Sequence, residues 1–406
     1  MNNSNLLKLL NDLKIVICIP VGRAGSYFFQ SLMDNNDQII SFPDRFDFKS
    51  FDLELFVNNN KKYFNSKYNN YNSGNKFLSH DEKVKFKLCE KTFINNYNEL
   101  ANIKSSISNR ERFILYHLAF ANLINKDLRK IRYIFCHIHN LNGEELKILK
   151  NLVIDFKKPK IIVMTRDIRE TISSYLDFSH KKNSIRGIEL IKGLHLYLTS
   201  TYIPFFKFYN ELKKPDIKII DLNLFHLKGE NNIKKIVKWL EIEFENNMTK
   251  STVLGEPWFG NSSSKNKING FNKSRGKLNY SKKLSVEEIM IIERLFHQII
   301  LKFGYNLDYT MNESKHLMKV NLLNYNFLKP FSLVEILILS KSINNKVFKS
   351  FPGFFKNIII FFIYGCFPNI RSYFKFKKLI KESFFEKSIS DLEKIRFDKN
   401  IFLCQN

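Results

Sequence analysis

The stretch that decides the fold is Lys14–Asn35, KIVICIPVGRAGSYFFQSLMDN. It begins with a run of apolar and β-branched residues that ends at Pro20, a pattern typical of a buried strand. After a turn that contains glycine, apolar residues recur at helical spacing from Phe28 to Met33. A strand, a tight turn and a helix in this order aim unpaired backbone N–H groups and the positive end of a helix dipole at one point. The stretch therefore predicts either an anion site or a plain connection between a strand and a helix.

A second stretch, Lys158–His180, follows the same plan with the sequence KPKIIVMTRDIRETISSYLDFSH. Its apolar run ends at Thr165, Arg166 stands at the carboxyl end of the expected strand, and Ser174 follows on the expected helix. Open α/β sheets bind ligands at the carboxyl ends of their strands, where a guanidinium fork and a hydroxyl can hold one anion. Two such stretches on one sheet edge predict a ligand with two phosphate groups. The first stretch does not meet the Walker pattern, because no Gly-Lys-Ser/Thr follows the required gap.

Together the two stretches resemble the sulfotransferases that use 3′-phosphoadenosine 5′-phosphosulfate (PAPS). Pro20–Leu32, PVGRAGSYFFQSL, is similar to the 5′-phosphosulfate loop of that family, and Arg166–Phe178, RDIRETISSYLDF, to its 3′-phosphate motif. The order of the two motifs also fits. Ala24 replaces the usual Ser of the loop, and Tyr27 replaces a Thr whose side chain would bind phosphate. At Tyr27, contact with phosphate is therefore expected from the backbone.

The resemblance implies PAPS as co-substrate and a set of residues that bind it. The first turn would hold the 5′ end, the second stretch the 3′-phosphate, and a basic loop before the last helix would fold over the nucleotide. The implied residues are Gly22, Arg23, Ala24, Gly25, Ser26, Tyr27, Arg166, Ser174, Arg275, Gly276 and Lys277. The basic loop lies in Gly255–Lys283, and the alternative interpretation of this segment is a solvated, flexible linker. Trp258 is a candidate to stack on a base or sugar.

The expected strand Ile131–Asn140, IRYIFCHIHN, carries His137 and His139 on one face. The residues leave three alternatives: half of a zinc site without nearby further ligands, two polar residues at a strand end, or a catalytic group. In the resembled family a Lys-Thr-His stretch ends the equivalent strand, and its His is the general base. By that resemblance His139 is the base, His137 takes the Lys position, and Arg23 helps to stabilise the leaving oxygen. No metal is expected.

The alternation of expected strands and helices predicts an α/β fold, a parallel sheet flanked by helices as in P-loop-like sulfotransferases. Further along, Ile185–Leu212 reads as one long helix, Asp216–Leu224 as a strand, and Ser285–Phe303 as a helix that opens with a capping box. The expected organisation is a sulfotransferase domain over 1–310 and a helical, basic, aromatic-rich extension over 311–406. The extension is read either as an interfacial segment on an anionic membrane or as a subdomain on the core.

Composition limits the class of partner. Lys and Arg exceed Asp and Glu, 65 to 39, which gives a net charge of +26 and favours anionic partners, although a base-biased genome would also produce it. The five cysteines include no CxxC pair, which argues against a disulfide framework. No export signal is visible in the first residues, so the predicted location is the cytosol, with peripheral membrane contact left open.

The predicted function is transfer of the sulfuryl group from PAPS to a hydroxyl acceptor, a carbohydrate or glycolipid. A P-loop nucleotide-dependent kinase is the rival within the same fold. A non-enzymatic module that binds anionic membrane or nucleic acid rests on the net charge of +26 alone. No nucleic-acid motif is recognisable, so no nucleic-acid partner is expected.

Overall fold

The computed structural model describes residues 3–43, 52–59, 64, 88–138, 141, 143–156, 159–180, 186–212, 216–259, 269–309 and 402–403. His139 and nearly all of the predicted 311–406 extension lie outside the described residues. The chain divides into two compact units. Unit 1 is Met1–Thr165, Leu212–Lys277 and Lys399–Asn406, and unit 2 is Arg166–Glu211 and Leu278–Asp398.

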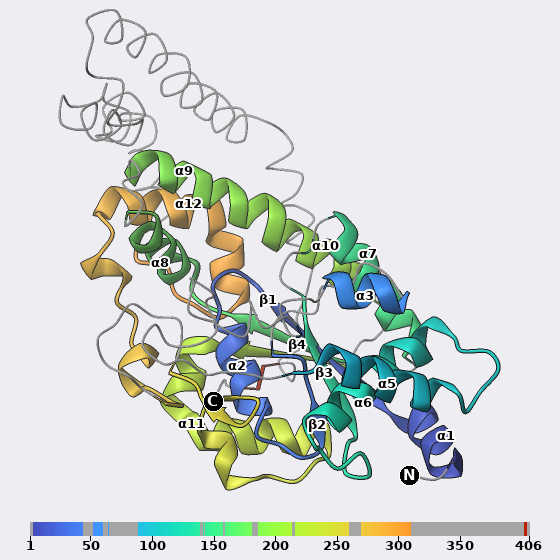
Figure 1. Cartoon of the computed structure of the whole chain (residues 1–406). Helices are drawn as coiled ribbons and strands as arrows, with labels where there is room; N and C mark the ends of the chain where they lie inside the picture. The colour runs from blue at the N-terminus through green and yellow to red at the C-terminus, as the bar shows by residue number, and fades with distance from the viewer. Residues whose placement is uncertain are drawn as a thin grey trace, which may run out of the picture. The chain divides into compact units, whose positions relative to one another are not determined.

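Unit 1 is built on a five-stranded parallel sheet with the strand order β2-β3-β1-β4-β5 (Figure 1). The strands are β1 Lys14–Pro20, β2 Ile39–Ile40, β3 Tyr133–His137, β4 Lys160–Thr165 and β5 Asp216–Asp221. β1 is central, paired in parallel with β3 on one side and with β4 on the other. Helices flank this sheet, so the predicted α/β fold class is confirmed.

The apolar run of the opening stretch forms the buried centre of this sheet. Ile15 to Ile19 are each 0% exposed, as expected for a parallel strand covered on both faces. Alternate residues of the strand, Val16 and Cys18, belong to the core cluster that also contains Phe29 and Leu32 of α2 (Ser26–Met33). The helical spacing of apolar residues in α2 is therefore explained by its packing on one face of β1.

The other helices of unit 1 support strands across the width of the sheet. α11 follows β5 directly and packs against β4 and β5, whereas α6 packs against β2. These helices are α1 Asn3–Asp12, α3 Leu53–Asn59, α5 Glu90–Ala101, α6 Asn109–Leu123, α7 Gly143–Asp155 and α11 Leu222–Leu240. Unit 1 also contains the short helices η2 Asn246–Thr249 and η3 Lys273–Gly276 and a short antiparallel hairpin, β6 Thr252–Val253 and β7 Glu256–Pro257.

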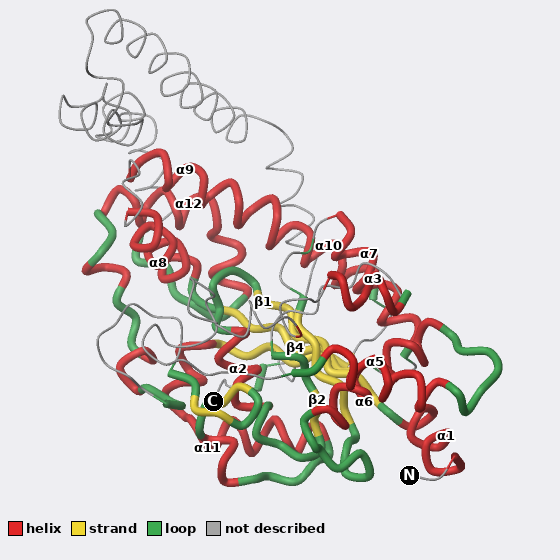
Figure 2. Tube along the Cα trace, viewed as in Figure 1, coloured by secondary structure: helices red, strands yellow, loops and turns green. Residues whose placement is uncertain are grey.

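Unit 2 is helical in its described part, as the colouring by secondary structure in Figure 2 shows. Its elements are α8 Ile168–His180, α9 Arg186–Tyr197, η1 Leu198–Tyr202, α10 Ile203–Glu211, η4 Tyr280–Lys282 and α12 Val286–Lys302. The predicted capping box of α12 is present, since the Ser285 side chain accepts from the Glu288 N–H and the Glu288 side chain accepts from the Ser285 N–H.

One predicted helix of unit 2 is interrupted. The single helix expected over Ile185–Leu212 consists of α9, a π-helical turn at η1, and α10. The interruption lies next to Pro204, which has no N–H to donate to the carbonyl of the preceding turn. Pro204 thus explains the local π-helical turn. The helical periodicity of the flanking residues does not reveal this interruption.

Candidate functional site

The turn between β1 and α2 has a backbone shape that needs glycine. Gly22 and Gly25 have φ angles of 85° and 76°, in the left-handed region. A Cβ on Gly25 would also lie 2.6 Å from Cδ1 of Leu222, the first residue of α11. The Val21 N–H donates to the Met164 carbonyl at 2.8 Å and ties the turn to β4. The turn is therefore fixed by its own backbone and by two neighbouring elements.

The start of α2 has the properties of an anion site. Its N-cap is Gly25, which provides no side-chain hydrogen bond to the first-turn N–H groups. Those N–H groups and the helix dipole favour a phosphate or sulfate group at this position. Ser26 is buried at the first position of the helix, and Arg23 is exposed in the turn. The predicted loop residues thus provide backbone donors and one cation beside them.

The position of this turn in the sheet matches the place where open α/β sheets bind ligands. β1 lies between β3 and β4. The chain goes from β1 to β2 and β3 on one side of it and then crosses to β4 and β5 on the other side, so the strand order reverses at β1. The carboxyl end of such a strand is the crevice in which ligands of doubly wound folds bind. Pro20, the last residue of β1, is opposite Met164 of β4. Thr165, the next residue and the carboxyl end of β4, is opposite Asp221 of β5, so the three strands end at the same edge of the sheet. The turn lies at this edge within unit 1.

His137 ends β3 and is attached to α2 by a buried hydrogen bond. Its Nδ1 lies 2.9 Å from Oε1 of Gln30, and the imidazole is 1% exposed. The Gln30 amide nitrogen donates to Ser41 Oγ and to the Phe42 carbonyl, so its oxygen faces His137 and Nδ1 carries the proton. The Tyr27 ring meets the imidazole edge-on, with centroids 4.6 Å apart. Sequence reasoning did not single out Gln30, a polar residue outside the apolar stripe that Phe28, Phe29, Leu32 and Met33 form on α2.

His139, the predicted base, lies just beyond the described end of β3. The Ile138 N–H donates to the Cys18 carbonyl at 3.0 Å, so the chain is still held against β1 one residue earlier. Its role as the base stays a prediction.

The predicted basic loop is pinned to α11 within unit 1. Gly276 is buried. A Cβ at this position would collide with the Leu227 side chain and touch the Asn223 carbonyl, so the close packing on α11 requires glycine here. The Asn223 side chain donates to the Arg275 carbonyl at 2.9 Å. Arg275 and Lys277 themselves are exposed. The loop thus presents two cations on a fixed backbone.

Aromatic packing joins this basic loop to the first turn of α2. The Phe28 ring stacks on His226 of α11, with centroids 4.5 Å apart and 26° between the planes. Phe28 also meets the Phe271 ring at 5.5 Å, edge to face. The Asn272 N–H, next along the loop, donates to His226 Nδ1. Unit 1 therefore brings the glycine turn and the basic loop onto the same aromatic cluster.

The two 3′-phosphate candidates belong to unit 2, which begins directly after Thr165. Arg166 is paired with Glu170 one helical turn later, at 2.9 Å, and its side chain is 19% exposed. Glu170 also accepts the backbone N–H of Asn279. Ser174 lies on α8 and is half-buried. The convergence of Arg166 and Ser174 with the glycine turn stays a prediction.

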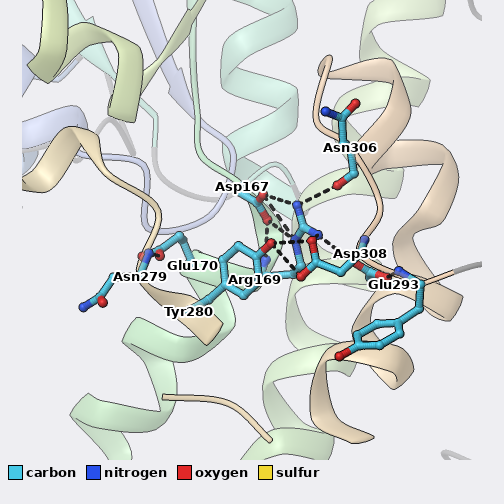
Figure 3. Close-up of polar contacts among 9 residues, drawn as sticks. Asp167, Arg169, Glu170, Asn279, Tyr280, Glu293, Asn306 and Asp308 are labelled. Atoms are coloured by element: carbon cyan, nitrogen blue, oxygen red, sulfur yellow. Dashed lines mark hydrogen bonds and ion pairs between the residues drawn. The ribbon is translucent and has the colours of Figure 1, made fainter. Parts of the chain in front are cut away.

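A buried ion cluster holds the chain just after Arg166 (Figure 3). Arg169 is 1% exposed and binds Asp167 at 2.7 Å, Glu293 at 2.5 Å and the Asn306 carbonyl at 2.9 Å. Burial alone lowers the pKa of the Arg169 guanidinium, but the hydrogen bond and charge of Asp167 outweigh it and raise that pKa. The cluster fixes the amino-terminal end of α8 to α12. Sequence reasoning missed it, because two of its partners, Glu293 and Asn306, are distant in the chain.

The described residues give no sign of a metal centre or of a membrane span. No group of three or more His, Cys, Asp or Glu side chains gathers among them in a way that could hold a metal ion. No described helix combines the length and apolar character needed to cross a membrane.

Comparison with known proteins adds little. No protein-family model matches the chain, and no curated protein matches it. Among solved structures, it is similar to the sulfotransferase domain from the curacin biosynthetic pathway, with 12% identity and a TM-score of 0.37 over 73% of this chain and 99% of that one. A likeness at this level carries no argument about function.

Proposed function

We propose that the protein is a PAPS-dependent sulfotransferase that acts on a hydroxyl acceptor, a carbohydrate or glycolipid. The observation that carries the proposal is the turn at Gly22–Tyr27. Its left-handed glycines, its uncapped helix start and its place at the carboxyl end of the central strand provide an anion site built from backbone. The sequence motif at Arg166 and Ser174 supports a second phosphate group on the same ligand.

The turn fits the 5′ end of PAPS by its geometry. Only glycine leaves room for the Leu222 side chain at position 25, so the turn keeps its left-handed backbone, and the N–H groups of the first turn of α2 would bind a tetrahedral anion. PAPS supplies the sulfuryl group and leaves as 3′,5′-ADP. Arg23 and the N–H groups of the turn stabilise the charge that develops on the leaving oxygen.

The acceptor side of the reaction requires a base. His139 accepts the proton of the acceptor hydroxyl as the oxygen attacks sulfur. His137, buried and bonded to Gln30, fixes the end of β3 that leads to His139. Arg275 and Lys277 supply further positive charge over the nucleotide from the loop on α11.

Nucleotide binding separates this proposal from its two rivals. In calorimetry, a sulfotransferase binds 3′,5′-ADP in preference to ATP, whereas a kinase of the same fold prefers ATP. A non-enzymatic binder of anions shows no preference and a steep dependence on salt. A labelled-sulfate assay over glycans, glycolipids and phenols then identifies the acceptor. Absence of transfer to every acceptor, together with preference for ATP, would refute the proposal.

The variant Arg166→Ala sharpens that test. It is expected to weaken 3′,5′-ADP by about 2–4 kcal/mol, because it removes a charge-assisted contact to a partly buried phosphate. Adenosine 5′-phosphosulfate lacks the 3′-phosphate and is expected to lose little. Arg186→Ala is the matched control, since Arg186 is an exposed arginine of unit 2 that pairs with Glu288. Equal losses for both nucleotides would show that Arg166 does not bind the 3′-phosphate.

A further inference from the structure

The outer edge of the sheet in unit 1 carries a short segment from far along the chain. β5 is the last strand in the order β2-β3-β1-β4-β5, so β4 covers one of its sides and the other is a sheet edge. Phe402 forms a parallel bridge with Ile219 of β5, and the Leu403 N–H donates to the Ile219 carbonyl at 3.1 Å. The strand pairs of this sheet are parallel as well. The segment Phe402–Leu403 therefore continues the sheet in its own direction.

The side chain of Leu403 anchors this segment. It packs against the core cluster to which Ile220 of β5 and Ile233 and Ile236 of α11 belong. Nζ of Lys235, on the same helix, lies 3.5 Å from the Leu403 carbonyl oxygen. An apolar anchor combined with backbone hydrogen bonds to a strand edge is the way in which an extended peptide adds to a sheet.

The contact has the properties of a reversible attachment. Phe402 and Leu403 are both only half-buried, and segments with few buried contacts open at a low free energy. A strand edge also offers backbone groups to any extended segment that reaches it. We infer that the outer edge of β5 is a docking edge for an extended apolar peptide, and that the segment Phe402–Leu403 of this chain is its resident, detachable occupant.

This docking places the chain between Tyr309 and Phe402 between two anchors. The backbone N–H groups of Asp308 and Tyr309 donate to the Glu293 carboxylate in unit 2, at 2.8 and 3.0 Å. Leu403 provides the other anchor in unit 1. Detachment from β5 removes this second anchor, so the docked segment controls how freely the predicted basic extension is tethered. The inference is independent of the proposed function.

The test releases the segment in the full chain and offers the same sequence as a free peptide. Leu403→Asp places a carboxylate against the apolar cluster and is expected to detach the segment, because burial of an unpaired charge is costly. Leu403→Met keeps an apolar side chain of similar volume and is the matched control. The probe is a fluorescein-labelled peptide of residues 399–406, KNIFLCQN, with serine in place of Cys404, and its binding is followed by fluorescence anisotropy.

The labelled peptide is expected to bind the Leu403→Asp chain saturably, with micromolar affinity. The native chain and Leu403→Met are expected to bind it at least about tenfold more weakly, because a tethered segment competes at an effective concentration of about a millimolar. A labelled peptide that itself carries the Leu403→Asp change is expected to bind none of the three chains.

Hydrogen exchange read by mass spectrometry checks that the segment detaches and that the fold remains. In the native chain the fragment that contains Leu403 is expected to be protected, because the Leu403 N–H is bonded to Ile219. In Leu403→Asp this protection is expected to disappear, whereas β1 and β4 stay protected. If β1 also exchanges, the variant is unfolded, and Leu403→Ala, which removes only part of the apolar contact, replaces it in both measurements.

Four results would overturn the inference. A folded chain that has lost protection at Leu403 but does not bind the peptide shows that the β5 edge does not dock peptides. Equal affinity of the native and detached chains shows that the segment does not occupy the edge, and protection that survives in both Leu403→Asp and Leu403→Ala shows that it does not detach. Self-association of the detached chain that excess peptide leaves unchanged assigns the edge to a second copy instead. All of these measurements are made without nucleotide, so they leave the proposed function untouched.

Discussion

Gln30 of α2 and His137 of β3 form a buried hydrogen bond of 2.9 Å between residues 107 positions apart in the chain. Gln30 also donates to Ser41 Oγ and to the Phe42 carbonyl, so one amide joins a helix, a strand end and the segment after β2. The bond fixes the tautomer of His137, with the proton on Nδ1. It connects the glycine turn at the start of α2 to the strand that leads to the predicted base.

Gln30→Leu is expected to destabilise the fold by about 1–3 kcal/mol, because it leaves buried polar groups of His137 and Ser41 without their partner. Gln30→Glu is the informative counterpart, since a carboxylate still accepts from His137 and favours the protonated imidazole. The His137 pKa, followed by NMR, is expected to rise in Gln30→Glu relative to the native chain. An unchanged pKa in a folded Gln30→Glu variant would contradict the contact.

Gly25→Ala is expected to cost more than backbone strain alone. The φ of 76° is unfavourable for alanine, and the new Cβ would lie 2.6 Å from Leu222 Cδ1. Gly143→Ala is the matched control, because Gly143 has a φ of 56° but nothing lies within 4 Å of the place that a Cβ would take there. Denaturant unfolding should show a loss of about 1–2 kcal/mol for Gly143→Ala and a larger loss for Gly25→Ala. Equal losses would mean that the Leu222 contact relaxes freely.

Local signals in the sequence sufficed for β1, β3 and β4 and for the start of α12, but not for the short strands β6 and β7. The apolar run before Pro20 and the one before Arg166 became β1 and β4, because continuous apolar strands are what a buried parallel sheet requires. The strand predicted over Asp216–Leu224 ends earlier, at Asp221. There the side chain accepts from the Leu224 N–H and caps α11, so a strand end and a helix start share one residue.

Contacts between distant segments could not be predicted in the same way. Gln30 lies outside the apolar stripe of α2 and carries no signal in the sequence, and its partner His137 is revealed only when β3 pairs beside β1. The same holds for Arg169, whose partner Glu293 lies 124 positions away. Sequence periodicity reports which face of an element is buried, but it does not report which buried polar side chains meet.

The His117 side chain gives unit 1 a specific dependence on pH. It is fully buried in α6, and its Nδ1 donates to the Phe113 carbonyl at 2.9 Å. Burial lowers the pKa of His117 from 6.5 to about 3. Between pH 6.5 and about 3, His117 therefore stays neutral in the folded state, whereas it takes up a proton in the unfolded chain. The contribution of neutral His117 to the free energy of unfolding is complete above pH 6.5 and falls as the pH drops toward 3.

The variant His117→Asn isolates this effect, because the amide can still donate to the Phe113 carbonyl but does not titrate. The native chain is expected to lose up to about 1.4 kcal/mol per pH unit more than the variant below pH 6.5. Urea unfolding at several pH values measures the two slopes. Parallel slopes would show that His117 is protonated in the folded state as readily as in the unfolded state.

His139→Ala tests the predicted base. The expected result is a fall in the transfer rate of about 100- to 10,000-fold with unchanged affinity for 3′,5′-ADP, the usual contribution of a positioned general base. The reason is its place in the chain. Ile138, one residue earlier, is hydrogen-bonded to Cys18 of the central strand, whose carboxyl end leads into the Gly22–Tyr27 turn. The rate-against-pH curve should also lose its limb near the imidazole pKa of about 6.5.

His195→Ala is the matched control, because His195 is an exposed histidine of α9 and should leave the rate unchanged. His137→Ala is expected to lower the rate less than His139→Ala and to lower the melting temperature as well, since its imidazole is buried against Gln30. Normal turnover by His139→Ala, with transfer abolished in a folded His137→Ala or Asp44→Ala variant, would move the base to another residue. If the variant that abolishes transfer still prefers 3′,5′-ADP to ATP, the nucleotide site is independent of which residue is the base.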